Sequence, residues 1–186
     1  MRLTSHKLRS IIRESILLLE KSAEYVCPPA SQDVKLNTKN RNATRDKHDY
    51  GPMNPLAVSK GYWSAMARKW KGATPKEAAG MRCGNCIAFD YSSRMLECMP
   101  ISKDQYLKSG SKDAMDLADM TMIGKDAKDL PNFPDEAYVG FGYCWMHHFK
   151  CHSARSCDTW AGGGPITKDS ESYDWQEKSG IGKKKA

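Results

Sequence analysis

Most of the seven cysteines fall into two clusters that are far apart in the chain. The first contains a Cys-x-x-Cys motif and the second is dense in aromatic residues; together they comprise Cys83, Cys86, Cys98, Cys144, Cys151 and Cys157. Thiolates bind metals and carry redox chemistry, and a compact metal site draws its ligands from distant pieces of chain. The pattern therefore predicts a metal or iron–sulfur site built from both clusters. An odd cysteine count without an export signal argues against an extracellular disulfide scaffold.

The simplest four-ligand set takes two cysteines from each cluster: Cys83, Cys86, Cys144 and Cys157. Neighbouring aromatic side chains would exclude water from such a site and are expected to contact the cofactor; they are Phe89, Tyr143, Trp145 and Trp160. Cys98 and Cys151 then remain, either as a disulfide with each other or as buried thiols. Alternatively, Cys98 replaces Cys144 as a ligand. Cys27 is expected to be a free thiol outside the site.

Two segments resemble the high-potential iron–sulfur proteins. One is Cys83-Gly-Asn-Cys86-Ile-Ala-Phe89; the other is Gly142-Tyr143-Cys144, then twelve residues, then Cys157-Asp158-Thr159-Trp160. The resemblance implies a [4Fe–4S] cluster held by these four cysteines in a small, loop-rich fold that transfers single electrons. It covers about 30 of the 186 residues, and the 57 residues from Ile87 to Tyr143 far exceed the family's spacing.

Other chemistries use the same region. Zinc accepts mixed ligand sets, such as Cys83, Cys86, Cys151 and His152, and His147 and His148 lie nearby. Disulfides without metal are a further alternative. A catalytic cysteine would need a histidine base, but nothing in the sequence selects one cysteine over the others, so we expect no enzyme. The acidic residues Asp126, Asp129, Asp135 and Glu136 are interpreted as solvent-facing.

The first twenty residues form a separate segment. Apolar residues fall at helical spacing at Leu8, Ile11, Ile12, Ile16 and Leu19, and Lys7, Arg9 and Arg13 lie on the opposite side. This amphipathic helix could dock on a core or act as an organelle transit peptide. It also resembles the N-termini of tailed-phage proteins, and Leu18-Leu19-Glu20 is similar to the site cut by T4-type prohead proteases. That resemblance implies a removable capsid-targeting segment, and a phage-encoded protein in the host cytoplasm or virion.

We expect four segments: the helix at 1–20, a polar linker at 21–53, a cysteine-rich domain at 54–175 and a basic tail at 176–186. Cys27-Pro28-Pro29 is interpreted as blocking a helix. Helices are predicted between 54 and 71, from Thr74-Pro75-Lys76-Glu77 to Gly80, and over 112–122, with loop at 125–142 and a turn at 162–165. The fold class is thus a small, loop-rich domain with few short helices and little strand, organised around a cysteine-ligated metal cluster.

Composition limits the partners. The net charge of +7 is dispersed, which gives only general support for nucleic acid binding, and Trp63 and Trp70 are expected to lie in the core rather than to stack on bases. The apolar runs are too short to span a membrane. The expected partners are therefore a redox protein or other virion proteins.

Overall fold

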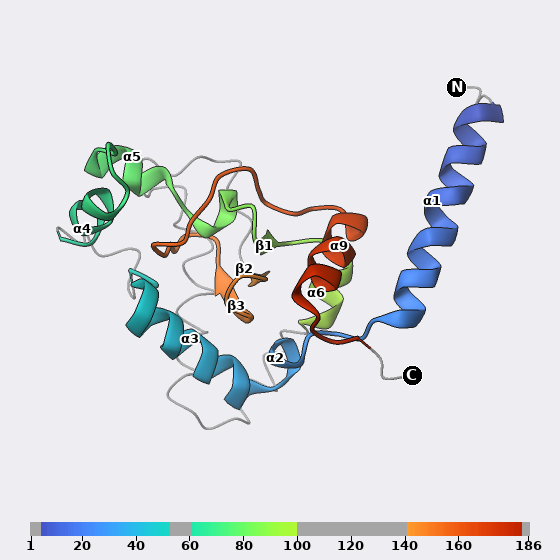
Figure 1. Ribbon diagram of the computed structural model, residues 1–186, viewed down its shortest axis with the longest axis horizontal. Helices are drawn as coiled ribbons and strands as arrows, with labels where there is room; N and C mark the ends of the chain where they lie inside the picture. The colour runs from blue at the N-terminus through green and yellow to red at the C-terminus, as the bar shows by residue number, and fades with distance from the viewer. Residues whose placement is uncertain (1–4, 53–60, 100–140, 184–186) are drawn as a thin grey trace.

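A computed structural model describes residues 5–52, 61–99 and 141–183 (Figure 1). In chain order, the elements are α1 (Ser5–Glu24), α2 (Pro29–Gln32), α3 (Val34–His48), α4 (Tyr62–Lys69), α5 (Pro75–Gly80), the 3₁₀ turn η1 (Cys83–Asn85), β1 (Phe89–Asp90), α6 (Ser93–Cys98), β2 (Phe141–Cys144), β3 (Phe149–His152) and α9 (Asp169–Ser179). Short helices surround a small central sheet, and α1 extends away from the body beside α9 (Figure 1). The prediction of short helices with little strand is confirmed in the described residues.

The sheet is antiparallel with strand order β1-β2-β3. Paired residues point to the same side of a sheet, and consecutive residues point to opposite sides. Phe89 pairs with Cys144, Cys144 with Phe149, and Gly142 with Cys151, so these residues share one side, which we call the thiol face. Asp90, Tyr143, Lys150 and His152 consequently belong to the opposite side.

Two apolar clusters lie against this sheet. The cluster on the thiol face consists of Tyr50, Cys83, Phe89, Phe149, Cys151 and Cys157. The cluster on the opposite side consists of Ala30, Met95, Cys98, Met99, Tyr143, Trp145 and Ile166. Trp145 is fixed there because its indole Nε1–H donates to Asp90 Oδ2 over 2.8 Å. The sheet thus separates the cluster that holds Cys83, Cys151 and Cys157 from the cluster that holds Tyr143 and Trp145.

Helices α2 and α3 occupy most of the stretch that was expected to be a polar linker. Pro29 begins α2, where its missing N–H and fixed φ suit the first turn of a helix. The Asp33 side chain caps α3 by accepting from Leu36 N–H. Polar residues of α3 make hydrogen bonds to distant parts of the chain. Asn37 Oδ1 accepts from Lys150 N–H over 2.7 Å, and Asn40 donates to the His148 carbonyl over 2.7 Å. Amide side chains therefore attach this helix to the β2–β3 hairpin.

Several of the other predicted elements can be compared with the structure, and the rest lie outside the described residues. The helices α4 and α5 lie where helices were predicted, and α5 has the predicted capping box between Thr74 and Glu77. The N-terminal helix is present as α1 and runs beyond residue 20 to Glu24. The predicted helix at 112–122, the acidic residues between 126 and 136 and most of the loop at 125–142 lie outside the described residues. The loop prediction was wrong for residues 141–142, which begin β2. The helix α9 was not predicted and reaches into the expected basic tail.

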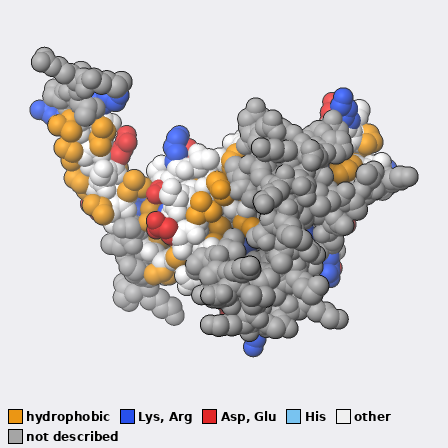
Figure 2. All heavy atoms as spheres, turned by 180° about the vertical axis from the view of Figure 1, so that it is seen from behind, with side chains coloured by type: hydrophobic (Ala, Val, Ile, Leu, Met, Phe, Trp, Pro, Cys, Tyr) orange, Lys and Arg blue, Asp and Glu red, His pale blue; other side chains and the backbone are white. Residues whose placement is uncertain are grey.

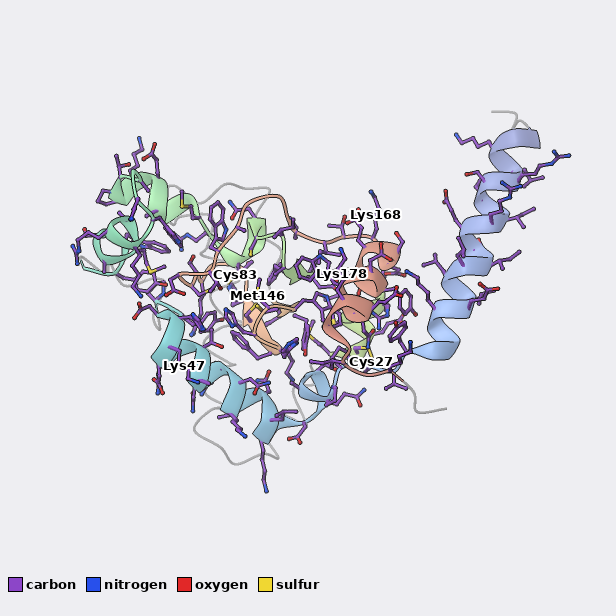
Figure 3. All side chains as sticks on the ribbon, viewed as in Figure 1. Cys27, Lys47, Cys83, Met146, Lys168 and Lys178 are labelled. Carbon is purple, nitrogen blue, oxygen red and sulfur yellow. A yellow bond between two sulfur atoms is a disulfide. The ribbon has the colours of Figure 1, made fainter. Side chains whose placement is uncertain are left out.

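A disulfide joins Cys27 to Cys98, with the two Cα atoms 5.4 Å apart. It links the segment before α2 to the end of α6, within the cluster on the sheet's opposite side (Figure 3). The expectation that Cys27 is a free thiol is therefore wrong. The alternatives for Cys98, which were a disulfide with Cys151, a buried free thiol and a ligand, are all excluded by this disulfide. The sequence could not show this pairing because the two partners are separated by 71 positions.

Among the helices that the structure describes, none is both long and apolar enough to cross a membrane.

Replacing both Cys27 and Cys98 with serine should lower the free energy of unfolding by about 2–4 kcal/mol, because the unfolded chain loses a long-range crosslink. Urea unfolding of the wild type and the double variant measures this difference. The same reductant added to both proteins should reduce the wild type to the variant's stability and leave the variant unchanged. Equal stability of the two proteins without reductant would contradict the assignment.

Candidate functional site

One largely enclosed pocket brings together every cysteine that is not in the disulfide. Its lining consists of Cys83, Cys86, Ala88, Phe89, Cys144, Met146, Cys151, Cys157, Thr159 and Trp160. The thiols come from three places: the η1 turn, the thiol face of the sheet and the loop that follows β3. Cys83 and Met146, which are labelled in Figure 3, lie close to each other near the middle of the body.

The Cys-x-x-Cys segment is a tight turn held by backbone hydrogen bonds. Within it, Cys86 N–H donates to the Cys83 carbonyl over 2.9 Å. The chain just after β3 holds it from one side, since Cys83 N–H donates to the Arg155 carbonyl and Gly84 N–H to the Ser153 carbonyl, over 2.6 and 2.9 Å. These bonds fix the first two thiols relative to the strand that carries Cys151.

The segment 160–164 holds the same turn from the other side. Trp160 Nε1–H donates both to the Arg82 carbonyl and to Asn85 Oδ1, each over 2.9 Å. Gly164 N–H donates to the Asn85 carbonyl over 3.2 Å. A side chain at Gly164 would overlap the backbone carbonyl of Cys86, so only glycine fits this close approach. Trp160 therefore both lines the pocket and anchors the turn that supplies two of its thiols.

Cys144 and Cys151 lie next to each other on the thiol face. The pKa of Cys144 is lowered, chiefly because the Cys151 side chain hydrogen-bonds to its sulfur, and further because the backbone N–H groups of His147 and Met146 do so. The pKa of Cys151 is raised well above its ordinary value, chiefly by burial. Of this pair, Cys144 is therefore the thiol that loses its proton more readily.

Cys157 is close to a series of polar side chains, which are those of Thr159, His147, His48 and Asp158. Its sulfur is 3.2 Å from the Thr159 hydroxyl and 3.9 Å from His147 Nε2, and the Thr159 hydroxyl is 2.7 Å from His147 Nε2. The His147 ring is 4.7 Å from the His48 ring, and His48 Nδ1 is 3.0 Å from Asp158 Oδ1. Burial lowers the pKa of His147 to about 4, so this imidazole is neutral at pH 7.

Burial is the main cause of the raised pKa of two further thiols. It raises the pKa of Cys86 to about 11, although the N–H groups of Ala161 and Ala88 partly offset the effect. It also raises the pKa of Cys157, which the Thr159 hydroxyl only partly offsets. A metal that bound these sulfurs would displace their protons, because thiolates rather than thiols are the ligands.

The structure places the predicted site residues as follows. All four predicted ligands line the pocket, together with Phe89 and Trp160. The predicted aromatic residues Tyr143 and Trp145 lie in the cluster on the other side of the sheet. Tyr143 precedes Cys144 in β2 and therefore faces the opposite side, and Trp145, which follows the strand, is held there by its hydrogen bond to Asp90. The residues that the sequence did not indicate are Ala88, Met146 and Thr159, which line the pocket, and Gly164, which approaches the Cys86 carbonyl too closely to carry a side chain. Thr159 follows Cys157 by two residues, and this short spacing could have indicated that its hydroxyl lies near the Cys157 sulfur.

The histidines of the zinc hypothesis are placed differently from the thiols. His152 follows Cys151 in β3 and thus points to the opposite side, where its ring meets that of Phe141 at 5.2 Å. Its Nδ1 accepts from Ala154 N–H over 3.0 Å. The predicted set of Cys83, Cys86, Cys151 and His152 is therefore not brought together. Within the described part of the chain, no group of three or more His, Cys, Asp or Glu side chains is arranged so that it could hold a metal ion.

No family model, curated protein or solved structure matches this chain.

Changing Gly164 to alanine should destabilise the protein by about 1–3 kcal/mol, because the new methyl group overlaps the Cys86 carbonyl and must displace the Cys-x-x-Cys turn. The control is Gly61→Ala, since a Cβ atom at Gly61 meets nothing within 4 Å. Urea unfolding measures both variants. Similar effects of the two substitutions would show that the turn does not depend on this close approach.

Proposed function

We propose that this chain binds a [4Fe–4S] cluster through Cys83, Cys86, Cys144 and Cys157. The observation that carries the proposal is the convergence of five reduced thiols from three chain segments on one pocket. Thiolates are the cysteine form that binds metals, and five thiols that line one pocket offer a complete ligand set. A shared ligand gives their convergence a physical reason.

The donor set suits iron–sulfur chemistry. Such clusters are held by four thiolates, and water exclusion and N–H groups directed at the sulfurs tune their potential. Here the aromatic side chains of Phe89 and Trp160 line the pocket and would exclude water. Backbone N–H groups that hydrogen-bond to the sulfurs of Cys144 and Cys86 would tune the potential. When bound, the cluster would supply one-electron redox chemistry.

A single zinc and a four-iron cluster would use the thiols differently. A single zinc draws all its sulfur ligands to about 2.3 Å from one point, whereas a four-iron cluster gives each thiolate its own iron. The described thiols line one common pocket, so metal analysis of the purified protein distinguishes the two cofactors.

The sheet supports the resemblance to the high-potential iron–sulfur proteins despite the long insertion. Phe89 lies three residues after Cys86 and pairs directly with Cys144. The chain thus leaves the sheet after β1 and returns to pair with β1, so the two halves of the site meet however long the intervening segment is. The cluster would serve in electron transfer, or as a structural link between these two halves.

We further propose that residues 1–20 are a removable segment of a virion protein. Apolar side chains along α1 are exposed, including Leu8, Ile12 and Ile16 at 48–49% (Figure 2). The contacts between the end of α1 and the body include ion pairs that lie after Glu20. Lys21 pairs with Asp174 and Glu177 of α9. A chain cut after Glu20 would keep these contacts.

The cluster proposal predicts that anaerobically purified protein is brown and contains about four irons per chain. Cys144→Ser and Cys157→Ser should each lose most of this iron, because each variant removes one of the four ligands. The matched control is the double variant Cys27→Ser/Cys98→Ser, which removes the same type of side chain from the disulfide and should retain the iron.

Colourless wild-type protein with one equivalent of zinc would contradict the cluster and support a zinc-binding structural protein of the virion. Protein that contains no metal and has further disulfides among the five thiols would support the disulfide alternative.

For the N-terminal segment, mass spectrometry of the protein from mature phage particles should find a chain that begins at Lys21. Glu20→Gln should block this processing, because the acidic side chain belongs to the site that resembles the protease's recognition sequence. Mature particles whose protein retains residues 1–20 would refute the proposal.

A further inference from the structure

The helix α1 carries a row of apolar side chains that stay exposed in the described chain. We call this row the apolar face; its members are 43–68% exposed and are Leu8, Ile11, Ile12, Ile16 and Leu19. Orange side chains line the extended helix in Figure 2. A row of exposed apolar side chains along one side of a helix marks an interaction surface.

We propose that the apolar face of α1 binds the same face of a second copy of the chain, with the two helices antiparallel. In a two-fold symmetric contact, the same surface is used on both copies, so every contact between two different residues occurs twice. The pairing therefore requires a helix whose apolar and charged positions match those of its own sequence read in reverse.

The apolar positions meet this requirement. Leu8, Ile12 and Ile16 follow one another at intervals of four residues and thus share one side of the helix. When Ile12 is set beside Ile16 of the second copy, symmetry sets Ile16 beside Ile12 of that copy. In the same alignment, Leu8 comes within one residue, or about 1.5 Å along the axis, of the level of Leu19 of the second copy.

The charges at the edge of the apolar face match in the same alignment. Arg9 and Glu20 are separated by about three helical turns, so they lie on the same flank of the face. Equivalent flanks meet in an antiparallel pair. Arg9 then comes within one residue of the level of Glu20 of the second copy, and symmetry forms this contact twice. Ion pairs at both edges of the apolar contact would fix the alignment of the two helices.

The charge pattern of α1 favours a protein partner over a lipid surface. A helix that lies on an anionic membrane has a polar side rich in Lys and Arg. In α1 the charges of opposite sign are interspersed, since Glu14 follows Arg13 and Lys21 follows Glu20. Such a pattern suits a partner that also carries both signs, as a second copy does.

The attachment of α1 to the body favours the antiparallel direction. The body is joined to the end of α1, where Lys21 pairs with Asp174 and Glu177 of α9 (Figure 1). A parallel pair would bring both bodies to the same end of the helices. An antiparallel pair places them at opposite ends of a contact about 30 Å long, so the bodies do not compete for space.

A chain cut after Glu20 would lose the whole apolar face, so the dimer would separate on processing. Only this consequence rests on the proposed removal of residues 1–20. The pairing itself depends neither on that removal nor on a bound cluster.

Sedimentation velocity of the full-length protein over a range of concentrations tests the pairing. The wild type should dimerise reversibly, and Ile12→Ser/Ile16→Ser should weaken the dimer at least about 100-fold, because both copies lose apolar side chains from the contact. The matched control is Leu17→Ser: Leu17 is 57% exposed on the other side of α1, so this variant should dimerise as the wild type does. A monomeric wild type, or equal dimerisation of the Ile12/Ile16 variant, would overturn the inference.

Exchange of the charges tests the direction of the helices. Arg9→Glu should weaken the dimer about tenfold, because it sets two acidic side chains together at each edge of the contact. Arg9→Glu/Glu20→Arg should restore dimerisation, since the pairs form again with their signs reversed. A double variant as weak as the single one would overturn the antiparallel pairing.

Two further measurements separate this inference from its alternatives. A wild type that stays monomeric and binds phosphatidylglycerol vesicles would overturn the pairing in favour of a lipid surface. Iron analysis of the same preparations tests the proposed cluster independently. A monomer with about four irons would overturn the pairing alone, whereas a dimer without iron would support the pairing and overturn the cluster.

Discussion

The pairing of β1 with β2 is the constraint on which the site depends. Phe89 pairs with Cys144, although more than fifty residues of chain separate them. Because β1 starts three residues after Cys86, this one contact places the Cys-x-x-Cys turn at the end of the strand that carries Cys144. The β2–β3 hairpin then adds Cys151, and the chain after β3 returns along the turn and adds Cys157. The β1–β2 pairing thus brings the two thiols of the turn to the three that lie on the sheet and in the loop after it, and the hydrogen bonds from the turn to the chain after β3 hold them there.

Successive side chains of a strand point to opposite faces of the sheet, and this determines which residues surround the thiols. Each strand is too short to bury much surface, but the residues of its two faces are sharply different. Cys144 and Cys151 share a face with Phe89 and Phe149, and Tyr143 belongs to the other. The Cys27–Cys98 disulfide lies in the cluster on that other side, away from the reduced thiols. The described chain thus holds its oxidised and its reduced cysteines in separate clusters, and a bound cluster would protect the reduced ones from oxidation.

Sequence reasoning succeeded where the determinants are local. The capping box of α5 needs only Thr74 and Glu77, which are three residues apart, and the amphipathic pattern of α1 is contained in one segment. It failed where the determinants are long-range. The partner of Cys27 lies at the end of α6, and α3 packs on the body through amide side chains that reach the backbone of a distant hairpin. Tyr143 was expected at the site because of its proximity to Cys144 in sequence, yet in a strand the nearest neighbours in sequence lie on opposite faces. Assigning residues 141–144 to a strand would have corrected that expectation.

The central claim is that the five-thiol pocket exists to hold a cluster of iron and sulfur. Its most direct test is a crystal structure of the anaerobically purified protein, with diffraction data collected on both sides of the iron absorption edge. The account predicts one compact group of iron anomalous peaks between the sulfurs of Cys83, Cys86, Cys144 and Cys157, with Cys151 outside that ligand set. A pocket without iron, or a single zinc held by another set of side chains, would contradict it.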